Sequence, residues 1–168
     1  AGFTGDRIEK LLEEKGVRAD FIKVEKGISR INVKLRSDEE TEINGQGPAI
    51  EGAEIERIYE KLDELQDGDT LVLAGSIPDV MPGSMYMDIM KHLQEKKLKI
   101  VVDATKDLLV NVLQYHPFLI KPNNHELGEI FGVKIESKED VVTYAKKMQE
   151  KGARNVLVSM AGDGAVLV

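Results

Sequence analysis

The stretch LKIVVDATKDLLVNVLQYHPFLIKPNNHELGEIF, residues 98–131, decides the fold class of this chain. Two short apolar runs, residues 100–102 and 118–120, alternate with two segments whose apolar residues recur at helical spacing. Strands that are buried on both faces read as continuous apolar runs, and helices connect them when they are parallel. The stretch therefore predicts two consecutive strand–helix units of a parallel sheet.

The same alternation extends in both directions, from residue 53 to the end of the chain. Helices are expected at residues 53–65, 82–96, 106–115, 124–131 and 137–152, and strands at residues 69–75, 98–104, 118–122, 155–162 and 164–168. Ser137 and Asp140 have the spacing of a capping box at the start of the last helix. The pattern predicts an α/β fold in which helices cover both faces of a mostly parallel sheet.

The first 52 residues follow another pattern. Residues 5–16 read as a helix, in which Asp6 and Glu9 have capping-box spacing and Gly16 marks the end. Residues 29–44 read as a β-hairpin because apolar and polar residues alternate strictly from Arg30 to Leu35. We expect one partial domain over 1–168, with a small hairpin portion at 20–45 and an α/β core at 53–168.

Composition narrows the function. The chain has 168 residues, which fits one domain, and a net charge of −7, which argues against a general nucleic-acid or membrane partner. It contains no cysteine, which excludes disulfides and thiolate metal sites and is compatible with the reducing cytoplasm that we expect for this protein. No apolar run approaches the roughly 20 residues of a membrane span.

The informative polar residues follow the predicted strands. Such residues occur after the strands at 69–75, 98–104, 118–122 and 155–162. Because the carboxyl ends of parallel strands share one edge of the sheet, these loops are expected to converge where open α/β sheets bind ligands. Lys121 can act as a point charge for phosphate, and the glycines at 162 and 164 allow backbone amides to approach an anion.

Asn123 and Glu126 stand three residues apart at a predicted helix start and therefore face the same side. An amide and a carboxylate suit Mg²⁺, directly or through its water shell. The alternative is a helix N-cap with an acidic residue in the first turn. Similarly, Ser76 is either a ligand-binding or a turn residue, and the polar face with Arg30 and Asn32 is either a binding or a solvated strand face.

Taken together, six segments resemble the ribokinase-like (PfkB) family of sugar kinases. They are GFTGDRIEKLLEEKGV, SRINVKL, TEINGQGP, VLAGSIP, IKPNNHEL and VLVSMAGDGAVL, in family order across essentially the whole chain. The resemblance implies a ribokinase-like three-layer sandwich with part of a small β-lid. It also implies ATP contacts at Lys121, Asn123, Ser159, Gly162 and Gly164, a magnesium contact at Glu126 through water, and sugar-phosphate contacts at Arg30, Asn32 and Ser76.

The resemblance further implies ATP-dependent phosphorylation of a sugar phosphate. The motifs are most similar to those of kinases that convert fructose 1-phosphate to fructose 1,6-bisphosphate, with tagatose-6-phosphate kinases as near neighbours. Mg²⁺ and ATP would be required, and the β-lid would form a homodimer contact. A kinase for another sugar or a nucleoside, and a non-catalytic protein that binds sugar phosphates or nucleotides, are the alternatives.

The chain reads as the central part of a longer protein. Position 1 is alanine, and the sequence stops on an apolar strand. By resemblance, a sugar-binding aspartate is expected before Ala1 and the catalytic aspartate after Val168, so no catalytic residue is assigned here. These 168 residues alone are therefore expected to be inactive.

Overall fold

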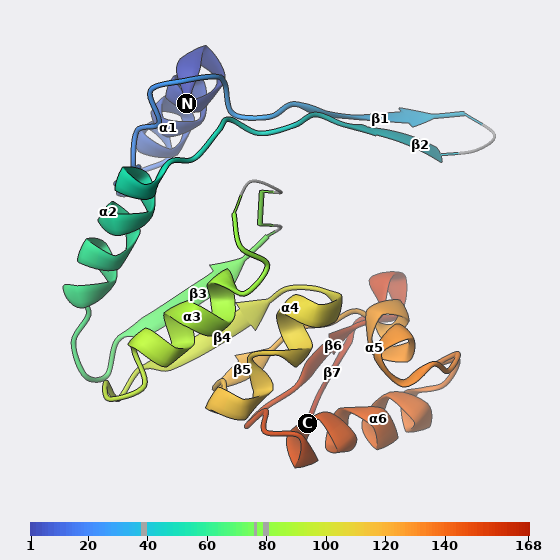
Figure 1. The fold of residues 1–168 in the computed structure, drawn as a ribbon. Coiled ribbons are helices and arrows are strands. Elements are labelled where there is room, and N and C mark those ends of the chain that lie inside the picture. The colour runs from blue at the N-terminus through green and yellow to red at the C-terminus, as the bar shows by residue number, and fades with distance from the viewer. Residues whose placement is uncertain (38–39, 76, 79–80) are drawn as a thin grey trace. The chain divides into compact units, whose positions relative to one another are not determined.

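The computed structural model describes residues 1–37, 40–75, 77–78 and 81–168 (Figure 1). The chain forms two compact units, which are Ala1–Leu62 with Pro78–Met81, and Asp63–Ile77 with Pro82–Val168. The helix expected at 53–65 falls almost entirely in the first unit, whereas sequence analysis began the α/β core at residue 53. The lid and core boundaries stay predictions.

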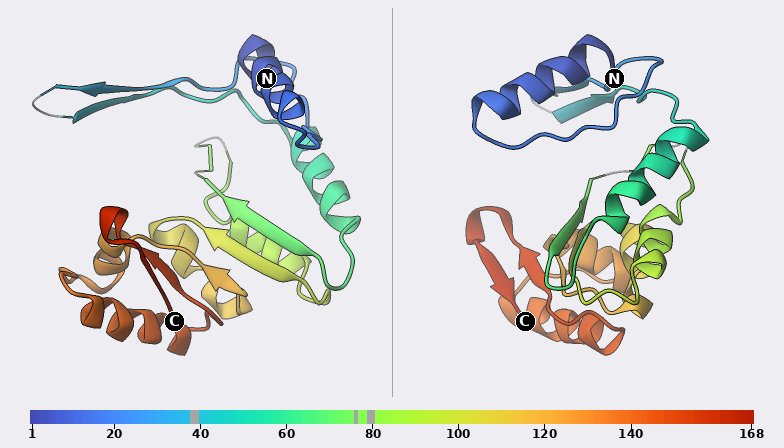
Figure 2. Two further views of the ribbon diagram at one scale, coloured as in Figure 1. Left: turned by 180° about the vertical axis from the view of Figure 1, so that it is seen from behind. Right: turned by 90° about the vertical axis from the view of Figure 1, so that its left-hand side faces the viewer.

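The first unit contains the predicted hairpin. Its elements are α1 Gly2–Glu14, β1 Asn32–Arg36, β2 Glu40–Asn44 and α2 Gly52–Asp63, of which Asp63 belongs to the second unit. The two strands are antiparallel, and Val33 lies opposite Ile43. Figure 2 shows them as a ribbon that projects from the rest of this unit. Val33, Leu35 and Ile43 form an apolar face that is exposed.

Helix α1 begins earlier than predicted. It starts at Gly2, so the capping box expected at Asp6 and Glu9 is wrong. Tertiary contacts hold the first turn instead, because the Thr4 hydroxyl donates to the Ser29 carbonyl at 2.8 Å. Asp6 and Glu9 both form ion pairs with Lys23. The predicted end is confirmed, since Gly16 adopts φ +75° just after the C-cap residue Lys15.

The second unit confirms the α/β prediction. Its elements are β3 Thr70–Ala74, α3 Met85–His92, β4 Lys99–Asp103, α4 Lys106–Val110, η1 Leu113–Tyr115, β5 Leu119–Ile120, α5 Asn124–Phe131, α6 Lys138–Glu150, β6 Leu157–Ser159, η2 Ala161–Asp163 and β7 Ala165–Leu167. Strands β3, β4 and β5 are parallel neighbours in that order, and β6 pairs antiparallel with β7.

The core of the second unit lies between this sheet and its helices. Fully buried side chains come from β4, α4, β5, α5, α6, β6 and the residue before β6, namely Val102, Leu109, Ile120, Leu127, Val141, Met148, Val158 and Val156. Burying each such side chain contributes about 1.5–3 kcal/mol. The two faces of the edge strand β3 are buried to different extents, because Leu73 is buried whereas Val72 is 58% exposed.

Two isolated parallel bridges connect β5 to β6. Ile120 pairs with Val156, and Asn123 pairs with Ser159 beyond the end of β5. The Ser159 amide also donates to the Pro122 carbonyl at 3.1 Å. The segment after β5 and the segment after β6 are therefore held side by side.

Helix α6 has the capping box that the sequence predicts. The Ser137 hydroxyl accepts from the Asp140 amide at 3.0 Å, and the Asp140 carboxylate accepts from the Ser137 amide at 3.1 Å. Hydrogen bonds to the Asp140 carboxylate, first from the Ser137 side chain and then from the Ser137 and Glu136 amides, lower the pKa of Asp140. Among the described residues, no helix is both long and apolar enough to span a membrane.

Candidate functional site

The candidate site lies in the second unit, at the carboxyl edge of β4, β5 and β6. Asp103 is the last residue of β4, Lys121 follows β5, and Ser159 ends β6. Asn123 is bridged to Ser159. The predicted convergence of strand-end loops is thus confirmed for the loops after β5 and β6.

Lys121 forms an ion pair with Asp103. Its Nζ lies 3.1 Å from the Asp103 carboxylate, and the two side chains are 40% and 41% exposed. A pair this open to water contributes about 1 kcal/mol or less. An anionic ligand can therefore reach the ammonium group, whose three N–H donors allow it to contact Asp103 and the ligand together. Asp103 was not among the predicted site residues, although a charged residue at the end of the apolar run IVVD was a usable signal.

Asn123 and Glu126 form the capping box of α5. The Asn123 Oδ1 accepts from the Glu126 amide at 2.8 Å, and the Glu126 Oε2 accepts from the Asn123 amide at 2.8 Å. The capping alternative is confirmed for both residues. Since a carboxylate can accept further hydrogen bonds through its second oxygen, this box leaves room for a ligand role of Glu126. That role stays a prediction.

The loop after β6 holds Gly162 and Gly164. Gly162 lies in η2, and Gly164 follows it with φ +88°. The Met160 amide donates to the Gly164 carbonyl at 2.8 Å, which closes the loop. Among the described residues, no heavy atom lies within 4 Å of the position that a Cβ would take at either glycine. The backbone there is open to an approaching group.

The residues predicted to contact a sugar phosphate are only partly described. Arg30 is exposed and precedes β1, and Asn32 begins β1 opposite Asn44. On the same strand face, Lys34 forms an ion pair with Glu42 that lowers the Glu42 pKa. The polar face is thus confirmed, and its binding role stays a prediction. Ser76 lies outside the described residues.

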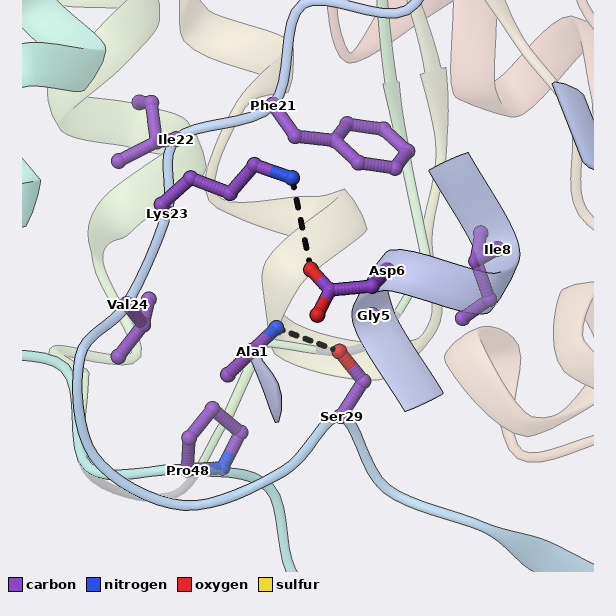
Figure 3. A pocket seen from close by; sticks show the side chains of 10 residues that line it. All are labelled: Ala1, Gly5, Asp6, Ile8, Phe21, Ile22, Lys23, Val24, Ser29 and Pro48. Atoms are coloured by element: carbon purple, nitrogen blue, oxygen red, sulfur yellow. Dashed lines mark hydrogen bonds and ion pairs between the residues drawn. The ribbon is translucent and has the colours of Figure 1, made fainter. Parts of the chain in front are cut away.

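The first unit also has a cavity of about 290 Å³ (Figure 3). It is lined by Ala1, Gly5, Asp6, Ile8, Phe21, Ile22, Lys23, Val24, Ser29 and Pro48. Charged and polar groups that line it already pair with each other. The Lys23 Nζ lies 3.6 Å from the Asp6 carboxylate, and the Ala1 amine donates a hydrogen bond to the Ser29 hydroxyl at 2.9 Å. We assign no ligand to it.

Comparison with known proteins decides the family. The profile of the pfkB family carbohydrate kinases matches residues 1–168. The chain belongs to this family. Among pfkB relatives, 1-phosphofructokinase from Bacillus subtilis is 47% identical over 166 residues, which is 99% of this chain and 54% of that protein. D-tagatose-1-phosphate kinase from Bacillus licheniformis is 38% identical over 98% of this chain and 54% of that protein.

Solved structures agree with the pfkB fold. Phosphofructokinase-2 from Escherichia coli, in complex with substrates and products, superposes with a TM-score of 0.87 at 24% identity. The match covers 99% of this chain and 56% of that protein. It confirms the predicted ribokinase-like fold class. The chain spans about half the length of the relatives that it matches.

The side chains at the carboxyl edge of the sheet determine how this pfkB chain could bind Mg²⁺. The described residues contain no group of three His, Asp or Glu side chains that could hold a metal ion. Mg²⁺ usually keeps several waters and binds through one or two carboxylates together with substrate phosphates. Glu126, beside the predicted phosphate-binding loop, fits such a water-mediated contact and does not fit a cage made of protein alone.

Glu126→Gln tests the magnesium prediction. In the complete protein we expect about a 10–100-fold loss in magnesium affinity or activity, because charge at a water-mediated contact is lost. Stability should change by less than about 1 kcal/mol. A magnesium titration of kcat at saturating ATP and sugar phosphate measures this. Asp140→Asn, which changes the matching capping-box residue of α6, is the control. An unshifted curve with normal kcat would make Glu126 purely structural.

Proposed function

We propose that the complete protein containing this chain is an ATP-dependent kinase for ketohexose 1-phosphates. Its reaction would convert fructose 1-phosphate to fructose 1,6-bisphosphate. The observation that carries the proposal is the bridge between Asn123 and Ser159, which joins the predicted phosphate segment to the predicted nucleotide loop. The names of the two Bacillus relatives share a ketohexose 1-phosphate. This favours tagatose 1-phosphate over tagatose 6-phosphate as the runner-up acceptor.

In this proposal the edge of the second unit binds the phosphates of ATP. Lys121 would donate one of its three N–H groups to a phosphate oxygen while another stays on Asp103, and Asn123 and the amides of 159–164 would bind further oxygens. The acceptor hydroxyl attacks the γ-phosphorus, the bond to the bridging oxygen breaks, and ADP leaves. Positioning and charge neutralisation are the main tasks of a protein in this reaction. Bound Mg²⁺ would neutralise phosphate charge, with Glu126 holding its water shell.

The proton acceptor is assigned to no residue of this chain. Asp163 lies within the η2 turn of the predicted nucleotide loop, where a nucleotide contact and not base catalysis is expected. In this proposal the proton is taken by a residue of the complete protein outside this chain, which spans 54% of 1-phosphofructokinase from Bacillus subtilis.

The hairpin and the cellular location belong to the same proposal. The exposed apolar face of Val33, Leu35 and Ile43 supports a homodimer contact through the β-lid, because burying it against a second copy would remove apolar surface from water.

We place the protein in the cytoplasm, since its proposed co-substrate is ATP and its chain lacks cysteine.

Arg30→Ala tests the sugar-phosphate side. In the complete protein the variant is expected to raise KM for the sugar phosphate about 10–150-fold, because a charge-assisted hydrogen bond is worth roughly 1.5–3 kcal/mol. The KM for ATP should change little. Arg7→Ala, an exposed arginine of α1 paired with Glu14, is the matched control. An unchanged KM for the sugar phosphate would mean that Arg30 belongs to a solvated strand face and binds no substrate.

A substrate panel tests the function itself. ADP formation by the complete protein is measured with fructose 1-phosphate, tagatose 1-phosphate, tagatose 6-phosphate and fructose 6-phosphate. The proposal predicts the highest kcat/KM for fructose 1-phosphate. Preference for a 6-phosphate would contradict the acceptor. Binding of ATP without turnover of any acceptor would favour the non-catalytic alternative.

A further inference from the structure

Tyr86 is a buried titratable residue that the proposed function leaves unused. It belongs to α3, is only 8% exposed, and is packed among the other buried residues of that helix. Its ring fits a core role, yet its hydroxyl reaches the carboxyl edge of the sheet. There it donates to the Gly75 carbonyl at 3.1 Å.

Gly75 connects this hydroxyl to β4. It follows the last residue of β3 and adopts φ +92°, which favours glycine. Its amide donates to the Asp103 carbonyl at 3.2 Å. The Gly75 peptide units are therefore held on both sides, by Tyr86 through the carbonyl and by Asp103 through the amide.

Asp103 connects the same network to the phosphate site. Its backbone is fixed through Gly75 and through its pairing with Ala74, and its carboxylate holds the Lys121 ammonium at 3.1 Å. Burial, and then the negative charge of Asp103, raise the pKa of the Tyr86 phenol. The phenol thus stays protonated at neutral pH and remains a hydrogen-bond donor.

We propose that Tyr86 is a positioning residue for Lys121. Its hydroxyl fixes the end of β3, the end of β3 fixes Asp103, and Asp103 orients the ammonium group toward the incoming phosphate. Because a catalytic group displaced by about 1 Å can lose 10²-fold in rate, even a small shift at Asp103 matters. This inference rests on the proposed function and adds a residue to its site.

The test is a double-mutant cycle in the complete protein. Tyr86→Phe keeps the ring and removes the hydroxyl. It should lower kcat about three- to tenfold, because the loss of one neutral hydrogen bond corresponds to a factor of this size. In a Lys121→Met background, the same change should alter kcat less than about twofold, because the group that Tyr86 positions is gone. Additive effects in both backgrounds, or an unchanged kcat for Tyr86→Phe alone, would overturn the proposal.

The control is Tyr115→Phe. Tyr115 is a half-buried tyrosine at the end of η1, which leads into the opposite, amino end of β5. It should leave kcat unchanged in both backgrounds. A comparable fall in kcat for Tyr115→Phe would mean that loss of any tyrosine hydroxyl disturbs the unit, and would also overturn the proposal.

Amide hydrogen exchange separates this inference from the proposed function. In Tyr86→Phe, the Gly75 amide should exchange faster, while buried amides of α6 keep their wild-type rates. An unchanged Gly75 rate would show that the hydroxyl does not hold the strand end. A complete protein that phosphorylates no acceptor would reject the proposed function, and the Gly75 rate would still decide whether the structural connection exists.

Discussion

Lys121→Met in the complete protein is expected to lower kcat about 10²–10³-fold, as removal of one preorganised donor to developing charge does in other enzymes. Methionine keeps the length of the side chain and removes its charge. The KM for the sugar phosphate should change little, because Lys121 is proposed to bind ATP phosphates. Folding should be unaffected, since the lost ion pair with Asp103 is open to water.

Steady-state kinetics with ATP and sugar phosphate varied separately measure this effect. Lys134→Met is the matched control, because Lys134 is 84% exposed and pairs only locally with Glu136 among the described contacts. It should leave kcat within about twofold of wild type, in the range of surface substitutions. A Lys121→Met enzyme with normal kcat would remove Lys121 from the phosphate site.

Gly152→Ala is expected to destabilise the second unit by about 2–6 kcal/mol, because backbone strain and overpacking each cost about 1–3 kcal/mol. Gly152 follows α6 with φ +128°. A Cβ there would lie 2.1 Å from the Leu113 carbonyl oxygen and 3.3 Å from His116 Nδ1. Backbone atoms cannot move aside as a flexible side chain can, so the end of α6 must shift.

Urea unfolding, followed by a probe in the second unit, measures this loss. Gly16→Ala is the control, because Gly16 also has a positive φ, +75°, but has no heavy atom within 4 Å of the added Cβ among the described residues. It should cost only about 1–2 kcal/mol, the conformational part alone. Equal losses for the two variants would show that the contact with Leu113 does not matter.

Local signals predicted the elements that carry their own start and stop. Helix α5 runs from Asn124 to Phe131 as expected, because a capping pair begins it and Gly132, at φ +64°, ends it. The same holds for α6, with its Ser137 box. Helix α1 differed because its start depends on contacts with Ser29, which lies 28 residues from Ala1 and leaves no signal in the local pattern.

The sequence was sufficient to predict which residues lie at the candidate site, but not which of their side chains contact each other. Lys121 and Asn123 follow from their places after a strand, since parallel topology brings such places together. Ser159 follows only from the family resemblance. The partner that holds Lys121, Asp103, depends on the register of β4 against β5, which apolar runs do not specify. The role of the Tyr86 hydroxyl could not be predicted from the sequence either, because a tyrosine on an apolar helix face is expected to be a core residue.

We propose above that the loops after β5 and β6 bind the phosphates of ATP. The most direct measurement is amide hydrogen exchange of the complete protein with and without MgATP. We expect MgATP to slow exchange at residues 121–126 and 159–164 and to leave exchange unchanged at 133–136, beyond the other end of α5. Unchanged exchange at 121–126 and 159–164 under saturating MgATP, with protection elsewhere, would contradict it.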